Sequence, residues 1–82
     1  MNILKNQHAR IVCNHAILGG KPTIAGTRIS VDLILKMLAQ GIAQEEILRE
    51  YPDLVQDDIL AVLAFAQETV ALEEVRHAEV FA

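Results

Sequence analysis

Apolar residues recur along the chain in a pattern that marks the starts of three helices. Each start has two apolar residues five positions apart, and the three pairs are Ile29 with Ile34, Ile42 with Ile47, and Leu54 with Ile59. This spacing is that of the hydrophobic staple, in which the residue before a helix cap packs on the fourth residue of the helix. Three such staples in succession predict three consecutive helices.

The first two helices have recognisable ends. The first is expected over 31–40, because Ser30 is a favourable N-cap, Asp32 complements the helix dipole and Gly41 ends the helix. Its inward face would consist of Leu33, Ile34, Met37 and Leu38. The second is expected over 44–50, and Tyr51-Pro52 ends it. Two short helices joined by a short turn are typical of a helix-turn-helix.

The third helix is expected to begin near Gln56 and to run past Thr69. Its residues 59–66 are apolar without interruption, so this part of the helix has no polar face to give to water. Helical spacing divides the run into two stripes, one of Ile59, Val62 and Ala66 and the other of Leu60, Leu63 and Ala64. The first two helices can cover only one stripe, so the sequence predicts a homodimer that covers the other.

The N-terminal part of the chain has the character of a small β segment. Residues 10–13 are predicted to form a strand, and Thr23 with Ile24 a second stretch before Gly26, which is an expected positive-φ residue. We therefore expect one mainly α domain over 1–82, with a homeodomain-like three-helix core behind the β segment. Its parts would be a frayed N-terminus (1–9), the β segment (10–29), the helix-turn-helix core (30–72) and an acidic helical extension (73–82).

The composition indicates a small intracellular protein. The chain has 82 residues, of which 52% are apolar, and its single cysteine, Cys13, cannot form an internal disulfide. A lone cysteine fits a reducing compartment. Residues 1–20 contain no continuous apolar stretch that would serve as a signal peptide or a membrane span. We therefore expect a cytoplasmic protein that does not contact a membrane.

The charges divide the chain into two unlike halves. Residues 1–42 carry five lysines and arginines against one aspartate, a net charge of +4, and residues 43–82 carry two arginines against ten acids, a net charge of −8. An anionic ligand would therefore bind the first half, and a basic partner would bind the second.

No group of residues indicates an enzyme. Neither a Ser-His-Asp nor a Cys-His pattern nor a pair of catalytic carboxylates is recognisable. The stretch Gly19-Gly20-Lys21-Pro22 lacks the spacing of a phosphate-binding P-loop. Cys13 with His15 offers two metal ligands where zinc needs three or four. The sequence therefore predicts a non-enzymatic protein without a metal, a cofactor or a small-molecule substrate.

A distinctive run of residues joins the β segment to the helices. It reads Gly19-Gly20-Lys21-Pro22-Thr23-Ile24-Ala25-Gly26-Thr27-Arg28-Ile29, and it is followed by Gly41, by Glu45-Glu46-Ile47-Leu48 and by Tyr51-Pro52. This run resembles the bacterial domain of unknown function 433 family, and the resemblance covers roughly Arg10 to Leu72. It implies a homeodomain-like helix-turn-helix fold and an antitoxin-like protein encoded beside a toxin of the PIN-like nuclease type.

Three positions depart from the family pattern. His15 stands where proline is common, and Ala43 and Val55 stand where Ser or Thr usually caps the second and third helices. The first change bears on the geometry of the β segment, and each of the others removes a cap worth about 1 kcal/mol. Asp53 with Gln56 would be an alternative capping box for the third helix.

Basic residues of the first half are the candidates for nucleic-acid binding. They are Lys21, Arg28 and Lys36, and an arginine in the position of Arg28 can make paired bonds with a phosphate. An ion pair of Arg28 with Asp32 and plain solvation of Lys21 are the structural alternatives. In the usual helix-turn-helix complex, the start of the third helix enters the major groove of DNA. Here that start reads Gln56-Asp57-Asp58, and its negative charge would face the DNA phosphates.

Partner binding is predicted for the third helix and the residues after it, and the candidates are Leu60, Leu63, Phe65, Leu72, Glu73 and Phe81. The acidic, amphipathic stretch 70–81 suits docking in a basic groove, with a solvated helix end as the alternative. Together with the resemblance, this favours a homodimeric antitoxin of a type II toxin-antitoxin system, which binds a PIN-like toxin through its acidic half. The alternatives are a DNA-binding transcriptional regulator that uses the basic half, and a structural adaptor.

Overall fold

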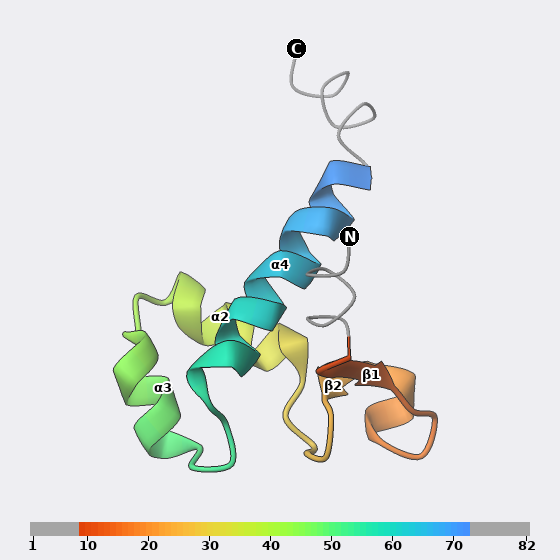
Figure 1. Ribbon diagram of the computed structural model, residues 1–82, viewed down its shortest axis with the longest axis horizontal. Helices are drawn as coiled ribbons and strands as arrows, with labels where there is room; N and C mark the ends of the chain where they lie inside the picture. Colours follow the sequence, from red (N-terminus) through yellow and green to blue (C-terminus); the bar gives the residue numbers. More distant parts are fainter. Residues whose placement is uncertain (1–8, 73–82) are drawn as a thin grey trace.

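The fold consists of a small two-stranded sheet and three helices (Figure 1). The computed structural model describes residues 9–72, so the predicted acidic extension lies outside the described residues. The elements in chain order are strand β1 (Ile11–Cys13), the short 3-10 helix η1 (Leu18–Gly20), strand β2 (Pro22–Ile24) and helices α2 (Val31–Ala39), α3 (Gln44–Glu50) and α4 (Gln56–Leu72). The predicted mainly α fold behind a short β segment is confirmed. Across residues 9–72, no helix has the length and apolar character needed to cross a lipid bilayer.

The three predicted staples supply the centre of the hydrophobic core. Their second members, Ile34, Ile47 and Ile59, are each 0% exposed. Their first members pack against the same core, Leu54 as a buried residue and Ile29 and Ile42 as half-buried ones. The buried core as a whole consists of Ile24, Val31, Ile34, Ile47, Leu54, Ile59 and Val62. The helix starts were therefore predicted correctly. Each staple places one isoleucine in the core that the three helices share.

Helix α2 begins and ends as the sequence predicts. The hydroxyl oxygen of Ser30 accepts a hydrogen bond from the amide of Leu33 at 2.9 Å, which makes Ser30 the N-cap. Gly41 has a φ of 86°, and the amide of Ile42 donates to the carbonyl of Met37 at 3.1 Å. A residue in the left-handed conformation, followed by a hydrogen bond from the next amide to a carbonyl in the last turn, is the Schellman motif. This motif ends the helix.

Helix α3 begins at an N-cap that has no side-chain hydrogen bond, because the cap residue is Ala43. Replacing Ala43 with serine would place a hydroxyl oxygen beside the amide of Glu46 and complete a capping box. We expect Ala43→Ser to raise the free energy of unfolding by about 0.5–2 kcal/mol, measured by urea denaturation. The control is Ala39→Ser, at the exposed last residue of α2, which should not stabilise. Equal or lower stability of Ala43→Ser would show that residue 43 does not act as a cap.

Helix α4 begins with half of a capping box. The amide of Val55, the residue before the helix, donates to Oδ2 of Asp58 at 2.9 Å. Asp58 is the third residue of the helix, the position from which a side chain reaches back to the cap amide. The predicted capping box of Asp53 with Gln56 was wrong. The side chain of Gln56 instead donates to Oε1 of Gln44 in α3 at 2.9 Å, and so joins the starts of two helices.

Strands β1 and β2 form the predicted β segment. They pair antiparallel, and the register places Ile11 opposite Ile24, Val12 opposite Thr23 and Cys13 opposite Pro22. His15, the departure from the family pattern that bears on this geometry, is exposed in the connection between the strands and does not prevent their pairing. An isolated bridge between Thr23 and Ser30 then ties the sheet to the start of α2.

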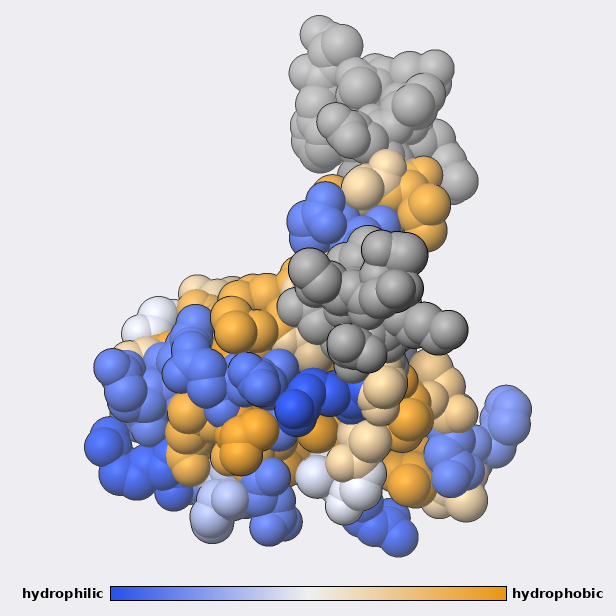
Figure 2. Space-filling view, viewed as in Figure 1, coloured by the Kyte–Doolittle hydropathy of each residue, from blue (hydrophilic) through white to orange (hydrophobic). Residues whose placement is uncertain are grey.

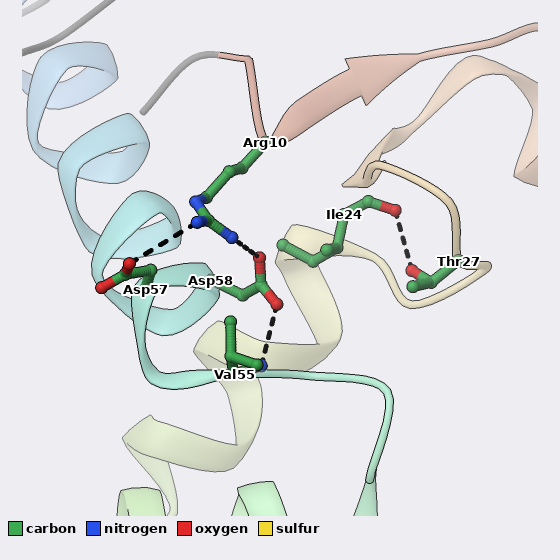
Figure 3. A network of polar contacts seen from close by, with 6 residues as sticks. All are labelled: Arg10, Ile24, Thr27, Val55, Asp57 and Asp58. Carbon is green, nitrogen blue, oxygen red and sulfur yellow. Dashed lines mark hydrogen bonds and ion pairs between the residues drawn. The ribbon is translucent and has the colours of Figure 1, made fainter. Parts of the chain in front are cut away.

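Part of the distinctive run folds into the corner that joins β2 to α2. Gly26 has a φ of 80°, the left-handed conformation predicted for it. The hydroxyl of Thr27 donates to the carbonyl of Ile24 at 2.8 Å (Figure 3) and accepts from the amide of Ile29 at 3.0 Å. These bonds fix the turn, bring Ile29 to the core and leave Arg28 exposed. Within this corner, Gly26, Thr27 and Ile29 therefore serve the fold.

Candidate functional site

An arginine from the start of the β segment binds the first turn of α4 (Figure 3). Arg10 Nη1 lies 3.0 Å from Oδ1 of Asp58, whose side chain is 7% exposed, and Arg10 Nη2 lies 3.5 Å from Oδ2 of Asp57. The second oxygen of Asp58 is bonded to the amide of Val55. Both carboxylates therefore have partners within the chain, and they stabilise the start of α4.

This arrangement makes the start of α4 a poor reader of DNA. In the usual helix-turn-helix, side chains of this turn contact base edges. Here Gln56 is bonded to Gln44 of α3, and Asp57 and Asp58 would bring negative charge toward phosphates. Arg10 was missed as a structural residue, because 48 positions separate it from Asp58 and no local pattern links the two.

The three predicted nucleic-acid-binding residues are exposed and lie on three different segments. Lys21 precedes β2, Arg28 lies in the corner after β2, and Lys36 lies on α2. Within residues 9–72, the alternative ion pair of Arg28 with Asp32 does not form. All three cations are therefore accessible to solvent. Along the chain, β2 and the start of the corner lie between Lys21 and Arg28.

The predicted partner-binding residues divide between two sides of α4. Leu60 and Leu63 are 43% and 39% exposed on the side away from the core. Phe65 and Leu72 lie on another side, where they line a groove together with Ile11 and Cys13 of β1. Phe65 also packs against the core, whereas Leu72 is 86% exposed. Glu73 and Phe81 lie outside the described residues.

The two predicted stripes of α4 differ in burial as expected at their first two positions, whereas Ala66 and Ala64 are both half-buried. Ile59 and Val62 are each 0% exposed, whereas Leu60 and Leu63 face solvent. The exposed side continues along the part of α4 that projects beyond the other helices (Figure 1), where Val70 is 59% exposed. Figure 2 shows apolar and polar residues next to each other on this projecting part. Within residues 9–72, α2 and α3 cover only one side of the apolar run.

A notch between α2 and α3 is a further candidate site, which the sequence analysis missed. The α2–α3 notch has an apolar floor and two carboxylates at its rim, and its lining residues are Met37, Ile42, Glu46, Ile47, Glu50 and Tyr51. Glu46 and Glu50 are exposed one turn apart on α3, and that spacing of four was the signal available in the sequence. Its volume is about 230 Å³, below the roughly 300–1,000 Å³ of small-molecule pockets. The notch therefore has the size for one side chain of another protein.

Comparisons with known proteins identify the family. A family model described as a protein of unknown function, DUF433, matches the chain over residues 11–66. This chain belongs to the DUF433 family. The solved crystal structure of a DUF433 member from Anabaena variabilis is similar to it, with a TM-score of 0.73 and 25% sequence identity over 94% of this chain and 76% of that chain. No curated protein matches the chain.

The DUF433 match agrees with the resemblance carried by the distinctive run. It spans the β2–α2 corner, the staple core and the whole α2–α3 notch, and it ends within α4. The description of the DUF433 family and the crystal structure of its member name no activity and no partner.

Proposed function

We propose that this chain is a non-enzymatic, antitoxin-like binding module that recognises a basic partner protein, a PIN-like nuclease, through its acidic half. The observation that carries the proposal is the α2–α3 notch, in which Glu46 and Glu50 flank an apolar floor that includes Ile47 and Tyr51. The module would act in the cytoplasm, where a reducing environment keeps the exposed Cys13 as a thiol.

The chemistry of the notch matches that of a long basic side chain. Lysine and arginine have apolar stems and charged heads, so the stem can cover Met37 and Ile42 while the head binds a rim carboxylate. The surroundings have the same sign of charge, because residues 43–72 contain one arginine against seven aspartates and glutamates. A field of this sign steers a basic protein toward the notch.

A nuclease is a suitable partner because it binds an anionic substrate. The surface of a nuclease that holds nucleic acid is expected to carry lysines and arginines. An acidic module that accepts one of these side chains would compete with the nucleic acid for that surface. The proposed role of the chain is therefore to block the nuclease by occupying its cationic surface.

Substitution of the two rim glutamates tests the proposal. We expect Glu46→Gln and Glu50→Gln each to weaken binding of a PIN-like nuclease, the proposed partner, by about tenfold, which is about 1.4 kcal/mol. Isothermal titration calorimetry of the purified proteins gives the dissociation constants. The control is Glu45→Gln, because Glu45 is exposed on the same helix but does not line the notch. Equal losses in all three variants would indicate a general effect of charge and would contradict a role for the notch.

A second candidate function is DNA binding through the basic half. The observation that favours it is that Lys21, Arg28 and Lys36 are exposed and that none has an ion-pair partner within residues 9–72. Cations of this kind supply phosphate contacts. The two functions are compatible, because an antitoxin can also repress its own operon.

A mobility-shift series on the DNA upstream of the gene tests this second function. We expect Arg28→Ala and Lys21→Ala to weaken any shift more than Gln56→Ala does, since Gln56 is bonded to Gln44 and the two cations are exposed. The loss should be the same for unrelated DNA sequences, as is usual for phosphate contacts. If Gln56→Ala has the largest effect, the start of α4 enters the groove after all.

A further inference from the structure

We infer that two copies of this chain pair through one face of α4. This face, the α4 stripe, consists of Leu60, Leu63, Ala64, Gln67, Val70 and Ala71. The inference is independent of the proposed nuclease binding, because the α4 stripe shares no residue with the α2–α3 notch.

The α4 stripe is a continuous helical face on the side away from the core. Its members are spaced by three and four residues, which places them in one row along the helix. The buried residues Asp58, Ile59, Ala61 and Val62 occupy the opposite side. At about 1.5 Å per residue the stripe is roughly 17 Å long, and its residues Leu63, Gln67, Val70 and Ala71 line a shallow groove. The stripe therefore runs from the body of the protein onto the projecting part of α4.

The lack of charge indicates which partner fits the α4 stripe. None of its six residues is charged. The stripe therefore provides no ion pair to a basic protein and no cation to the phosphates of DNA. A second copy presents the same uncharged face. In a two-fold symmetric dimer, the same surface of each copy forms both sides of the interface. Gln67 has an amide that both donates and accepts, so it can bond to a polar group of the other copy.

The sizes of the side chains also fit a pair of identical helices. An antiparallel arrangement centred on the stripe would place Leu60 of each copy opposite Ala71 of the other, and Gln67 opposite Ala64. Leu60 and Gln67 would then face alanines, which allow close approach of the two helices. Because one helix face is smaller than a standard interface of about 800 Å² per partner, the dimer should dissociate in the micromolar range.

Sedimentation equilibrium of the full chain at about 1–300 μM tests the inference. The wild type should pass from monomer to dimer over this range, and Leu63→Glu and Val70→Glu should each raise the dissociation constant at least tenfold. The control is Leu72→Glu, because Leu72 lies on the same helix and is more exposed than either residue but is outside the stripe. It should leave the dissociation constant within twofold of the wild-type value.

Gln67→Lys is a second variant that removes no apolar side chain, and it should weaken the dimer by placing like charges at the contact. Far-UV circular dichroism checks that each variant is folded. A monomeric wild type at every concentration, or an effect of Leu72→Glu as large as that of Leu63→Glu, would overturn the inference. A dimer that Gln67→Lys leaves unchanged would also overturn it. None of these outcomes concerns Glu46 or Glu50. The proposed nuclease binding is therefore tested independently of the dimer.

Discussion

Ile34→Ala is expected to lower the free energy of unfolding by about 2–5 kcal/mol, the range for truncating a fully buried isoleucine. Ile34 is 0% exposed, and its helix α2 packs against α3, α4 and β2. Truncation to alanine would leave a cavity at this position. The surrounding elements cannot fill it unless they shift relative to one another. A domain of this length has a total stability of roughly 4–12 kcal/mol, so the variant should lose a large share of its stability.

Urea denaturation at a fixed protein concentration measures this effect, with two comparison variants. Ile34→Val removes one methylene group and should cost about 0.5–1.5 kcal/mol. Lys36→Ala changes an exposed residue of the same helix and should stay within about 0.5 kcal/mol of the wild type. If Ile34→Ala were no less stable than Ile34→Val, α2 would not be the central element of the core.

Asp58→Ala is expected to lower the free energy of unfolding by about 2–4 kcal/mol, because it breaks two interactions at once. The amide of Val55 loses its side-chain acceptor. Arg10 loses the closer of its two carboxylate partners. Because the side chain of Arg10 is 40% exposed, water can solvate it in the variant, and the loss stays below that for a fully buried ion pair.

Asp57→Ala is the matched control for this prediction. Asp57 is the adjacent residue and binds the same arginine, but its side chain is 67% exposed and the contact is 3.5 Å long. An exposed pair of this kind contributes up to about 1 kcal/mol. Asp58→Asn should fall between the two alanine variants, because the amide oxygen can still accept from Val55. Similar losses for Asp57→Ala and Asp58→Ala would mean that the buried carboxylate does not fix the start of α4.

The helices could be predicted from the sequence because their determinants are local. Each staple needs two residues five positions apart, and the N-cap Ser30 and the stop at Gly41 act within one turn of α2. Local hydrogen bonding also explains the corner around Gly26 and Thr27. The capping of α4 was predicted incorrectly. Both Asp53 and Asp58 lie near the helix start, and only the geometry of the first turn selects Asp58.

The functional surface was less predictable because it depends on how elements meet. The floor of the α2–α3 notch combines Met37 of α2 with Ile47 of α3, and the turn between the helices determines their approach. The contact of Arg10 with Asp58 joins residues 48 positions apart. The apolar run of α4 predicted an exposed face with Leu60 and Leu63, but only the structure shows that this face continues through Gln67 to Val70 and Ala71.

The central claim is that the α2–α3 notch binds a basic partner protein. Mapping of backbone amide chemical shifts, with a PIN-like nuclease of the proposed partner class added to the isotope-labelled chain, tests it most directly. We predict that the largest shifts occur at the residues that line the notch, which are Met37, Ile42, Glu46, Ile47, Glu50 and Tyr51. Shifts confined to the region from Lys21 to Ile29, or no shifts at saturating concentrations of the nuclease, would contradict the claim.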